Sequence, residues 1–332
     1  MSATYLYYPG CSMDGSARAY AESLDVVCRW LGLRLEELDD WNCCGATEYL
    51  NLSPLKAHAL VGRNLALAER QRDGGQQLVA PCSACFVNLA KTEHAVRTTP
   101  ALAGRVNAAL AAGELSYTPG SVVVRHLVEV ILQDVGVDAV AAHVTRPLRG
   151  LRVAPYLGCL VTRPDYDHRW RSHEHPREFD RLLGALGADV VDYPLRTDCC
   201  GGHMTQISPG TGFELIRRLV EAAELLKADL LVTICPMCQM NVDAYQAEMN
   251  RFFHTSHHMP ILFFTQLMGL AFGAEADAVG VGSEIVSARA ALGRIGIEVP
   301  EPEQAEAPAA KRRPRREAGL PMPAPLGEEV PR

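Results

Sequence analysis

The chain has 332 residues, which exceeds the usual size of a single domain, and 48% of them are apolar and 21% charged, as in ordinary globular proteins. Its formal net charge of −7 at pH 7 argues against a surface that binds nucleic acid. No apolar run approaches the roughly 20 residues of a membrane-spanning helix, and the first residues lack the pattern of a signal peptide. We therefore expect a cytoplasmic protein with no transmembrane segment, whose cysteines are metal ligands or redox groups.

Strand and helix signals alternate over residues 1–99. Short runs rich in Tyr, Leu and Val predict strands, and apolar residues three or four positions apart predict helices. In chain order we expect a strand at 4–8, a helix at 20–31, a strand at 33–38, a helix at 54–71 and a strand at 76–80. This alternation predicts a parallel sheet that is covered by helices.

Residues 100–147 predict a helical connector. Apolar periodicity indicates helices over 101–112 and 122–135, and a Thr-Pro-Gly turn at 118–120 joins them.

Residues 148–275 repeat the order of the first segment. We expect strands at 152–157, 188–193 and 228–234, with helices at 179–186 and 213–226 between them. The fold class is therefore α/β, with two duplicated Rossmann-like βαβαβα halves that each contain a parallel sheet.

The C-terminal part differs in character from both halves. We expect a helical extension over residues 276–299, followed by a disordered tail rich in Pro, Ala and Arg over residues 300–332. The basic cluster in this tail, residues 311–316, is expected either to be solvated or to dock to an acidic partner, and it carries no chemistry.

Ten of the eleven cysteines form two copies of one pattern. Each copy contains a single Cys, an adjacent pair followed by Gly, and a C-x-x-C motif. The copies are Cys11, Cys43, Cys44, Cys82 and Cys85, and Cys159, Cys199, Cys200, Cys235 and Cys238. The spacings are 31 and 37 residues in the first copy and 39 and 34 in the second, and Asn88 and Asn241 follow their motifs at the same offset. Agreement of this kind indicates a duplication.

Every element of the cysteine pattern follows a predicted strand. Parallel strands bring their C-terminal ends to one edge of the sheet, where doubly wound sheets bind ligands. Five thiols from distant positions are therefore expected to converge on one site in each half.

The number of thiols constrains the group that each site holds. Thiolates select zinc, Cu(I) and iron–sulfur clusters, and a structural zinc ion or a cubane 4Fe-4S cluster takes four ligands rather than five. Neighbouring Cys side chains do not easily reach one metal at ideal angles, but one thiolate of a pair can bridge two irons. This favours clusters in both sites over structural disulfides, zinc in both sites, or zinc in one of them.

With these motifs the sequence resembles the cysteine-rich CCG domain, and the tandem arrangement is similar to the B subunit of heterodisulfide reductase. The resemblance spans residues 4 to about 275 and rests on all ten cysteines. It implies two noncubane 4Fe-4S clusters, each held by the five cysteines of one half. It also implies an oxidoreductase that cleaves or forms a disulfide between the two clusters, with each cluster supplying one electron.

The same resemblance implies partners and a substrate class. A ferredoxin-like C subunit and a flavin-containing A subunit would deliver electrons, because the sequence has no nucleotide-binding fingerprint of its own. The substrate would be a disulfide, a thiol or a related sulfur compound. Attachment to a membrane would come through the partners.

Three further features have both a functional and a structural interpretation. His203 follows the second Cys pair and is a candidate catalytic proton donor, or a histidine with a purely structural hydrogen bond. The polar stretch 165–175, which includes His173 and His175, is a candidate lid over an anionic substrate, or a hydrated loop. Cys28 lies on the apolar face of a predicted helix and is expected in the core.

Two other functions compete with a catalytic subunit. CCG domains also serve as electron-transfer or anchoring subunits of succinate-, fumarate- and quinone-linked enzymes, and a scaffold with zinc in one site is the third hypothesis.

Overall fold

The computed structural model describes residues 3–46, 49–72, 77–166 and 170–301. The chain divides into two units, residues 1–300 and 301–332, and the description below concerns the first. The expected tail and its basic cluster lie outside the described residues.

The first unit contains eight strands and seventeen helical segments among the described residues. The strands are β1 (Ala3–Tyr7), β2 (Leu33–Glu37), β3 (Leu78–Ala80), β4 (Val124–His126), β5 (Arg152–Tyr156), β6 (Asp189–Val190), β7 (Leu230–Thr233) and β8 (Ile261–Phe263). The helices of the first half and the connector are α1 (Arg18–Leu31), α2 (Tyr49–Leu52), α3 (Pro54–Gln71), α4 (Ser83–Thr98), α5 (Pro100–Leu110), η1 (Ala111–Gly113), α6 (Leu127–Val130), the π-helical η2 (Ile131–Val135) and α7 (Val137–Ala142). Those of the second half are α8 (Glu178–Ala185), α9 (Met204–Ile207), α10 (Pro209–Leu225), α11 (Pro236–Ala244), α12 (Gln246–Phe253), α13 (Phe264–Phe272), η3 (Asp277–Val279) and α14 (Arg289–Gly293).

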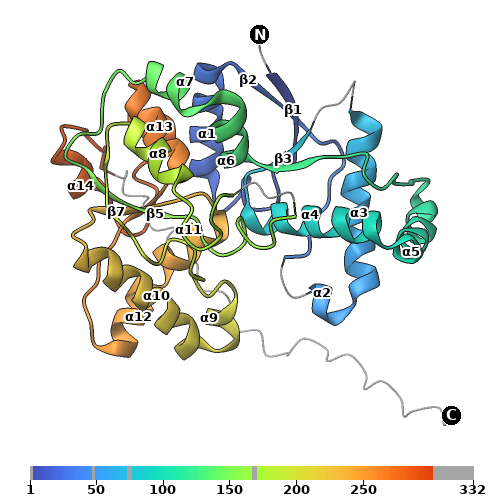
Figure 1. The fold of residues 1–332 in the computed structure, drawn as a ribbon. Coiled ribbons are helices and arrows are strands. Elements are labelled where there is room, and N and C mark those ends of the chain that lie inside the picture. Colours follow the sequence, from blue (N-terminus) through green and yellow to red (C-terminus); the bar gives the residue numbers. More distant parts are fainter. Residues whose placement is uncertain (1–2, 47–48, 73–76, 167–169, 302–332) are drawn as a thin grey trace, which may run out of the picture. The chain divides into compact units, whose positions relative to one another are not determined.

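The strands form two parallel sheets with the same topology. The orders are β2-β1-β3-β4 and β6-β5-β7-β8, and every pair of neighbours is parallel. The central strands β3 and β7 are fully buried, as their continuous apolar runs require. The structure therefore confirms the α/β class and the duplication of the halves (Figure 1).

The structure corrects the helix that the sequence predicts over residues 122–135. The stretch 100–147 is largely helical, but Val124–His126 forms strand β4, which pairs with β3 through Leu78↔Val124. Three consecutive valines at 122–124 favour extended backbone. The helix starts only at Leu127, where the side chain of His126 accepts a hydrogen bond from the backbone N–H of Val128.

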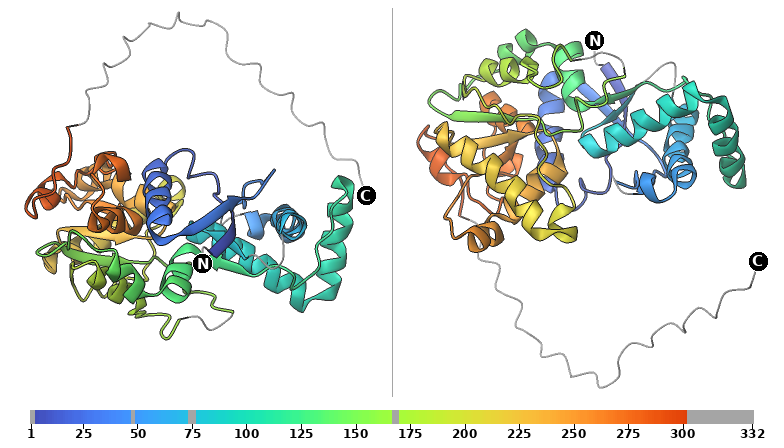
Figure 2. Two further views of the ribbon diagram at one scale, coloured as in Figure 1. Left: turned by 90° about the horizontal axis from the view of Figure 1, so that it is seen from above. Right: turned by 60° about the horizontal axis from the view of Figure 1, so that its bottom comes forward.

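Helices of each half pack against helices of the other half. Helix α1, which follows the first strand of the first half, packs against α13 and η3 of the second half, and α8 packs against η2 (Figures 1 and 2). Within the first contact, the hydroxyls of Ser23 and Thr265 are hydrogen-bonded at 2.7 Å. The core is therefore continuous from one sheet to the other.

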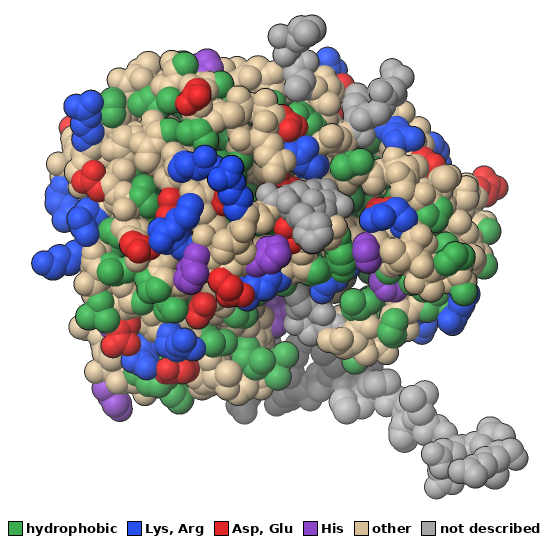
Figure 3. All heavy atoms as spheres, in the orientation of Figure 1, with side chains coloured by type: hydrophobic (Ala, Val, Ile, Leu, Met, Phe, Trp, Pro, Cys, Tyr) green, Lys and Arg blue, Asp and Glu red, His purple; other side chains and the backbone are tan. Residues whose placement is uncertain are grey.

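Acidic, basic and apolar side chains are interspersed on the face of the molecule in Figure 3. Over the part of the chain that the structure describes, no helix combines the length and apolar character that crossing a bilayer requires.

Candidate metal centre

The cysteines of both copies lie at the C-terminal ends of strands. Cys11 and Cys159 follow β1 and β5, and the two pairs follow β2 and β6. Cys82 and Cys235 are the N-cap residues of α4 and α11, so that Cys85 and Cys238 lie in the first turn of these helices. The backbone N–H groups of Cys85 and Cys238 face the sulfurs of Cys82 and Cys235, respectively, which favours thiolates there.

Nine of the ten sulfurs lie in one series of neighbouring thiols. Each thiol in it contacts the next one, and the distance between the Sγ atoms of Cys44 and Cys85 is 3.4 Å. The order is Cys43, Cys44, Cys85, Cys82, Cys235, Cys238, Cys200, Cys199 and Cys159. Cys11 lies near Cys43, at the first end of the series.

Contacts with both neighbouring thiols stabilise the thiolate form of three of these cysteines. Cys43 and Cys85 lower the pKa of Cys44 to about 3. Cys159 and Cys200 lower the pKa of Cys199 to about 2, and Cys238 and Cys82 lower that of Cys235 well below its ordinary value. Thiolates are the form that binds metals.

The two sites meet at Cys82 and Cys235. The thiols of these residues, which belong to different halves, are in contact with each other. The backbone N–H of Ser83 also donates to the sulfur of Cys235, across the boundary between the halves. The sequence predicts one convergence point in each half, and the structure adds that the two points are contiguous.

Glycines give the backbone close access to the sulfurs. Gly10 and Gly158 have φ angles of +71° and +69°, and a Cβ atom at either position would lie 2.8 Å from the Sγ of Cys85 or Cys238, respectively. At the second pair, Gly201 N–H donates to Cys199 Sγ at 3.3 Å and Gly202 N–H to Cys200 Sγ at 3.4 Å. Both positions therefore require glycine, because any other residue would have an unfavourable φ angle and a Cβ atom too close to a sulfur.

The polar groups that hold the cysteine loops are also duplicated. The hydroxyl of Tyr8 donates to the carbonyl of Asn42, which precedes Cys43, at 2.7 Å. Tyr156 does the same to the carbonyl of Asp198, which precedes Cys199, at 2.9 Å.

The two asparagines at the same offset act on the paired cysteines themselves. The side-chain amide of Asn88 donates to the carbonyl of Cys44 at 3.1 Å, and that of Asn241 donates to the carbonyl of Cys200. The repeated asparagines that the sequence shows are therefore part of the support of each Cys pair.

One part of the centre breaks the symmetry. In the first half, His126 Nδ1 accepts from Val128 N–H, so the Nε2 atom of the neutral ring carries the proton and lies 3.3 Å from Ser83 Oγ. Burial lowers the pKa of His126 to about 4. The corresponding positions of the second half hold Phe263 at the end of β8 and Pro236, which has no N–H to donate. The sequence pattern gives no signal for this asymmetry.

The donor set fits a sulfur-bridged iron centre. It contains only thiols, backbone N–H groups are directed at several sulfurs, and glycines leave room beside them. Cys11, Cys43 and Cys199 are exposed, whereas the junction is buried. Among the described residues, no group of three or more His, Cys, Asp or Glu side chains is arranged around a single metal ion.

The other candidate residues have mixed outcomes. Cys28 is buried in the core and takes no part in the series of sulfurs. His203 lies at the start of α9, and its catalytic role stays a prediction. His173 Nε2 lies 3.1 Å from a carboxylate oxygen of Asp165, and residues 167–169 of the polar stretch lie outside the described residues.

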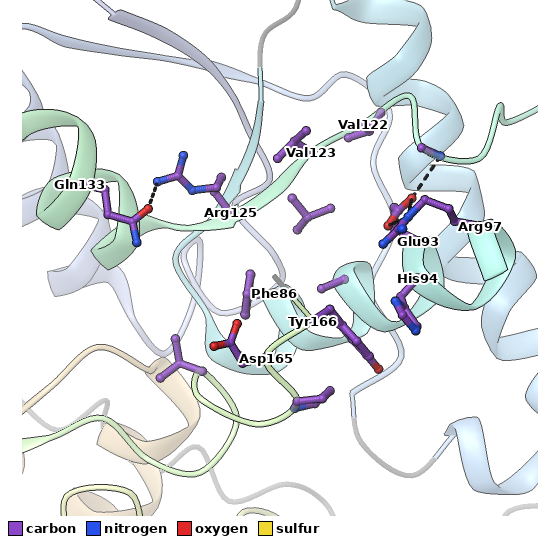
Figure 4. Close-up of a pocket in the computed structure, with 15 residues that line it drawn as sticks. Phe86, Glu93, His94, Arg97, Val122, Val123, Arg125, Gln133, Asp165 and Tyr166 are labelled. Carbon is purple, nitrogen blue, oxygen red and sulfur yellow. Dashed lines mark hydrogen bonds and ion pairs between the residues drawn. The ribbon is translucent and has the colours of Figure 1, made fainter. Parts of the chain in front are cut away.

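Part of that polar stretch lines a pocket of about 440 Å³ (Figure 4). Asp165 and Tyr166, from the loop after Cys159, face Phe86 and His94 of α4, and the rings of Tyr166 and His94 are stacked at 4.0 Å. In the first half, residues that follow Cys11 line a similar pocket of about 520 Å³ against α11 and β8. Each pocket is therefore built from both halves.

Comparisons with known proteins agree with this duplication. Residues 5–90 and 153–243 each match the family of the cysteine-rich domain CCG. The chain is 31% identical over 288 residues to the 8-methylmenaquinol:fumarate reductase membrane anchor subunit of Wolinella succinogenes, which covers 87% of this chain and 99% of that protein. It is 27% identical over 277 residues to the B subunit of the ferredoxin/F420H2-dependent CoB-CoM heterodisulfide reductase of Methanosarcina acetivorans, covering 82% and 91% of the two chains.

A third relative and one solved structure extend the comparison. A protein of Archaeoglobus profundus that is described as similar to the B subunit of heterodisulfide reductase is 27% identical over 280 residues, which cover 83% of this chain and 92% of that protein. A hypothetical protein from Helicobacter pylori has the same fold, with a TM-score of 0.68 at 13% identity over 86% of this chain, which spans about half of that protein (52%). On the strength of its two matching domains, the chain belongs to the cysteine-rich CCG family, in the tandem form of the heterodisulfide reductase B subunit.

Proposed function

We propose that the protein is the catalytic iron–sulfur subunit of a heterodisulfide-reductase-like complex, with one noncubane 4Fe-4S cluster in each half. Each cluster would be held by the five cysteines of its half, and zinc in one of the sites is the alternative cofactor. The observation that carries the proposal is the contact between Cys82 and Cys235, because it makes two five-cysteine sites contiguous. Breaking one S–S bond takes two electrons, which two adjacent one-electron centres can supply together.

When bound, the clusters would supply the electrons and the irons that hold the product sulfurs. The chain's own residues keep ten sulfurs in place and stabilise negative charge on them. Exposed Cys11, Cys43 and Cys199 mark the sides from which a disulfide or thiol substrate reaches the sites, whereas the buried junction excludes water between them. His203, at the start of α9 beyond the second Cys pair, is the candidate that protonates a product thiolate.

Electrons would come from a ferredoxin-like C subunit and a flavin-containing A subunit. One relative is named as the B subunit of a ferredoxin-dependent reductase, which supports a partner of this kind. We place the complex in the cytoplasm, with any membrane association through its partners. The boundaries 1–99, 100–147, 148–275 and 276–299 are our proposal for its domains.

The test starts with iron and acid-labile sulfide counts on anaerobically purified protein. We expect about eight irons in each chain, since a 4Fe-4S cluster takes four. The variant Cys199→Ala should lose the second cluster alone, and Cys28→Ala, which removes a thiol outside the series, should keep both. Addition of a thiol to the oxidised protein should then produce a paramagnetic signal. If the thiol leaves the spectrum of the fully loaded protein unchanged, the catalytic role is wrong.

That negative result would favour a second function, an electron-transfer or anchoring role in a quinone-linked oxidoreductase. It is supported by the 31% identity to the membrane anchor subunit of a fumarate reductase over nearly the full length of that protein.

A further inference from the structure

The hydroxyl of Tyr20 lies at the junction of the two sulfur sites. It is within hydrogen-bonding distance of two backbone carbonyls, that of Pro81 at 3.4 Å and that of Ile234 at 3.2 Å. These are the residues immediately before Cys82 and Cys235, the two cysteines whose thiols meet between the halves. The side chain is fully buried, so no water competes for the hydroxyl proton.

The ring of Tyr20 is held firmly in this position. It stacks on Phe263 with a centroid distance of 4.4 Å and an interplanar angle of 13°. It also packs against Phe264 in a T-shaped arrangement, with the ring centroids 6.1 Å apart. One turn further along α1, the hydrogen bond between Ser23 and Thr265 fixes the helix against α13. A residue of the first half is thus packed into the second half and bonded to the backbone of both.

Other tyrosine hydroxyls of the centre act inside one half. Tyr8 and Tyr156 each donate to the carbonyl before a Cys pair of their own half, and Tyr193 donates to the carbonyl of Leu219 at 2.9 Å. Among the described tyrosines that donate to a backbone carbonyl, Tyr20 is the one that reaches both halves.

We propose that Tyr20 is a positioning residue that sets the separation of the two sulfur sites by tying together the carbonyls before Cys82 and Cys235. This inference rests on the proposed function, in which each site holds a cluster. The hydroxyl lies closer to the carbonyl of Ile234, at 3.2 Å, than to that of Pro81, at 3.4 Å. Loss of the Tyr20 hydroxyl therefore falls mainly on Ile234 and the loop that carries Cys235.

The decisive variant is Tyr20→Phe, which keeps the stacked ring and removes only the hydroxyl. Tyr193→Phe is the matched control, because it removes an equally buried hydroxyl that bonds one carbonyl within one half. Two readouts apply to the full chain. One is the electron paramagnetic resonance interaction between the two reduced centres in the loaded protein. The other is the rate at which a mild oxidant joins Cys82 to Cys235 after the clusters are removed, followed by peptide mapping.

We expect wild type, Tyr20→Phe and Tyr193→Phe to contain equal amounts of iron. Tyr20→Phe should change the interaction signal and slow the formation of the Cys82–Cys235 disulfide by roughly fivefold. This is the effect that one hydrogen bond of ordinary net strength has on the population of molecules in which the two thiols are in contact. Tyr193→Phe should match wild type in both. If Tyr20→Phe does not fold, Phe263→Leu removes the stacking surface and should shift both readouts in the same direction.

The outcomes separate this inference from the proposed function. A loaded Tyr20→Phe protein whose interaction signal and disulfide rate both equal those of wild type would overturn the role of Tyr20 and leave the function standing. Wild-type protein with no iron, or with iron in one half alone, would overturn the function. The disulfide rate of the cluster-free chain would still decide whether Tyr20 holds the junction.

Discussion

At the scale of single residues, two glycines set the space available beside the sulfurs. Replacing Gly10 by Ala places a Cβ atom 2.8 Å from Cys85 Sγ, and Gly158→Ala does the same to Cys238. Since real Cβ atoms do not approach so closely, the buried sulfur must move away from its ligand position. We expect each variant to lose about four of about eight irons, from the altered half alone, in an iron and sulfide count.

Gly32→Ala is the control for these two variants. Gly32 has a φ of +64°, so an alanine there bears the same left-handed strain of about 1 kcal/mol, but apart from its own chain neighbours no atom of the described residues lies within 4 Å of its Cβ position. It should keep all of its iron. A Gly10→Ala protein with as much iron as Gly32→Ala would contradict this account, because the contact with the sulfur would then not displace the ligand.

His126 gives the stability of the protein a dependence on pH. Burial lowers the pKa of its imidazole to about 4, whereas an exposed histidine in the unfolded chain titrates near 6.5. Between these values the unfolded chain binds a proton that the folded chain does not, so stability falls as the pH falls through this window. From pH 7.5 to pH 5 the loss should be about 2 kcal/mol.

The measurement is the free energy of unfolding in urea at the two pH values. His126→Gln should lose about 2 kcal/mol less than wild type over this interval, because it lacks the titrating ring. His254→Gln, at an exposed position of the second half, should follow wild type. Equal pH dependence in wild type and His126→Gln would mean that the ring is protonated in the folded protein.

At the scale of elements, the helices after the second Cys pair depend on a glycine for their contact. A Cβ atom at Gly212 of α10 would lie 2.7 Å from the backbone N and Cα atoms of Thr205 in α9. Backbone atoms cannot move aside cheaply, so we expect Gly212→Ala to lower the free energy of unfolding by about 1–3 kcal/mol. Gly184 of α8 has open space around it, and Gly184→Ala should be neutral or stabilise by up to about 1 kcal/mol. Equal urea midpoints for the two variants would contradict this account.

Local sequence signals predict most of these elements. Helix α3 spans Pro54–Gln71, the range that apolar spacing and a proline at the helix start predict. The sequence does not distinguish strand β4 from a helix, because the three valines at 122–124 and the apolar Leu127 and Val128 beyond them fit either period. Pairing with β3 decides between a strand and a helix. Short strands of this kind are set by tertiary contacts rather than by propensity.

The sequence predicts the ten cysteines as a set, but it does not predict the contacts that join the halves. The Cys pattern occurs twice, and the agreement between the two copies marks these ten cysteines as functional residues. Tyr20 meets Pro81 and Ile234 across 61 and 214 positions of the chain, and no repeat or local motif indicates such contacts. The same holds for Ser83, whose role depends on Cys235 of the other half.

At the scale of the whole molecule, each half supplies parts that the other half needs. Helix α1 packs on α13, α8 packs on η2, and the connector is bound to the second half. In that contact, Thr145 Oγ1 donates to the carbonyl of Phe272 at 2.8 Å, and Arg146 Nε donates to that of Leu270 at 3.1 Å. The two halves are thus copies of one another by topology, and each completes the core of the other.

This interdependence predicts how the halves behave when they are separated. Produced alone, residues 1–147 lack the partner surface for α1, and residues 148–300 leave the apolar helix α13 without α1. We expect neither fragment to be stable or to bind iron, and co-production of the two to restore a complex with about eight irons. The unbroken chain ending at residue 300 is the control, because residues 301–332 form a separate unit, and it should retain its iron. Four irons in each isolated fragment would show instead that the halves fold independently. The contact between Cys82 and Cys235 would then join two domains that are each stable alone.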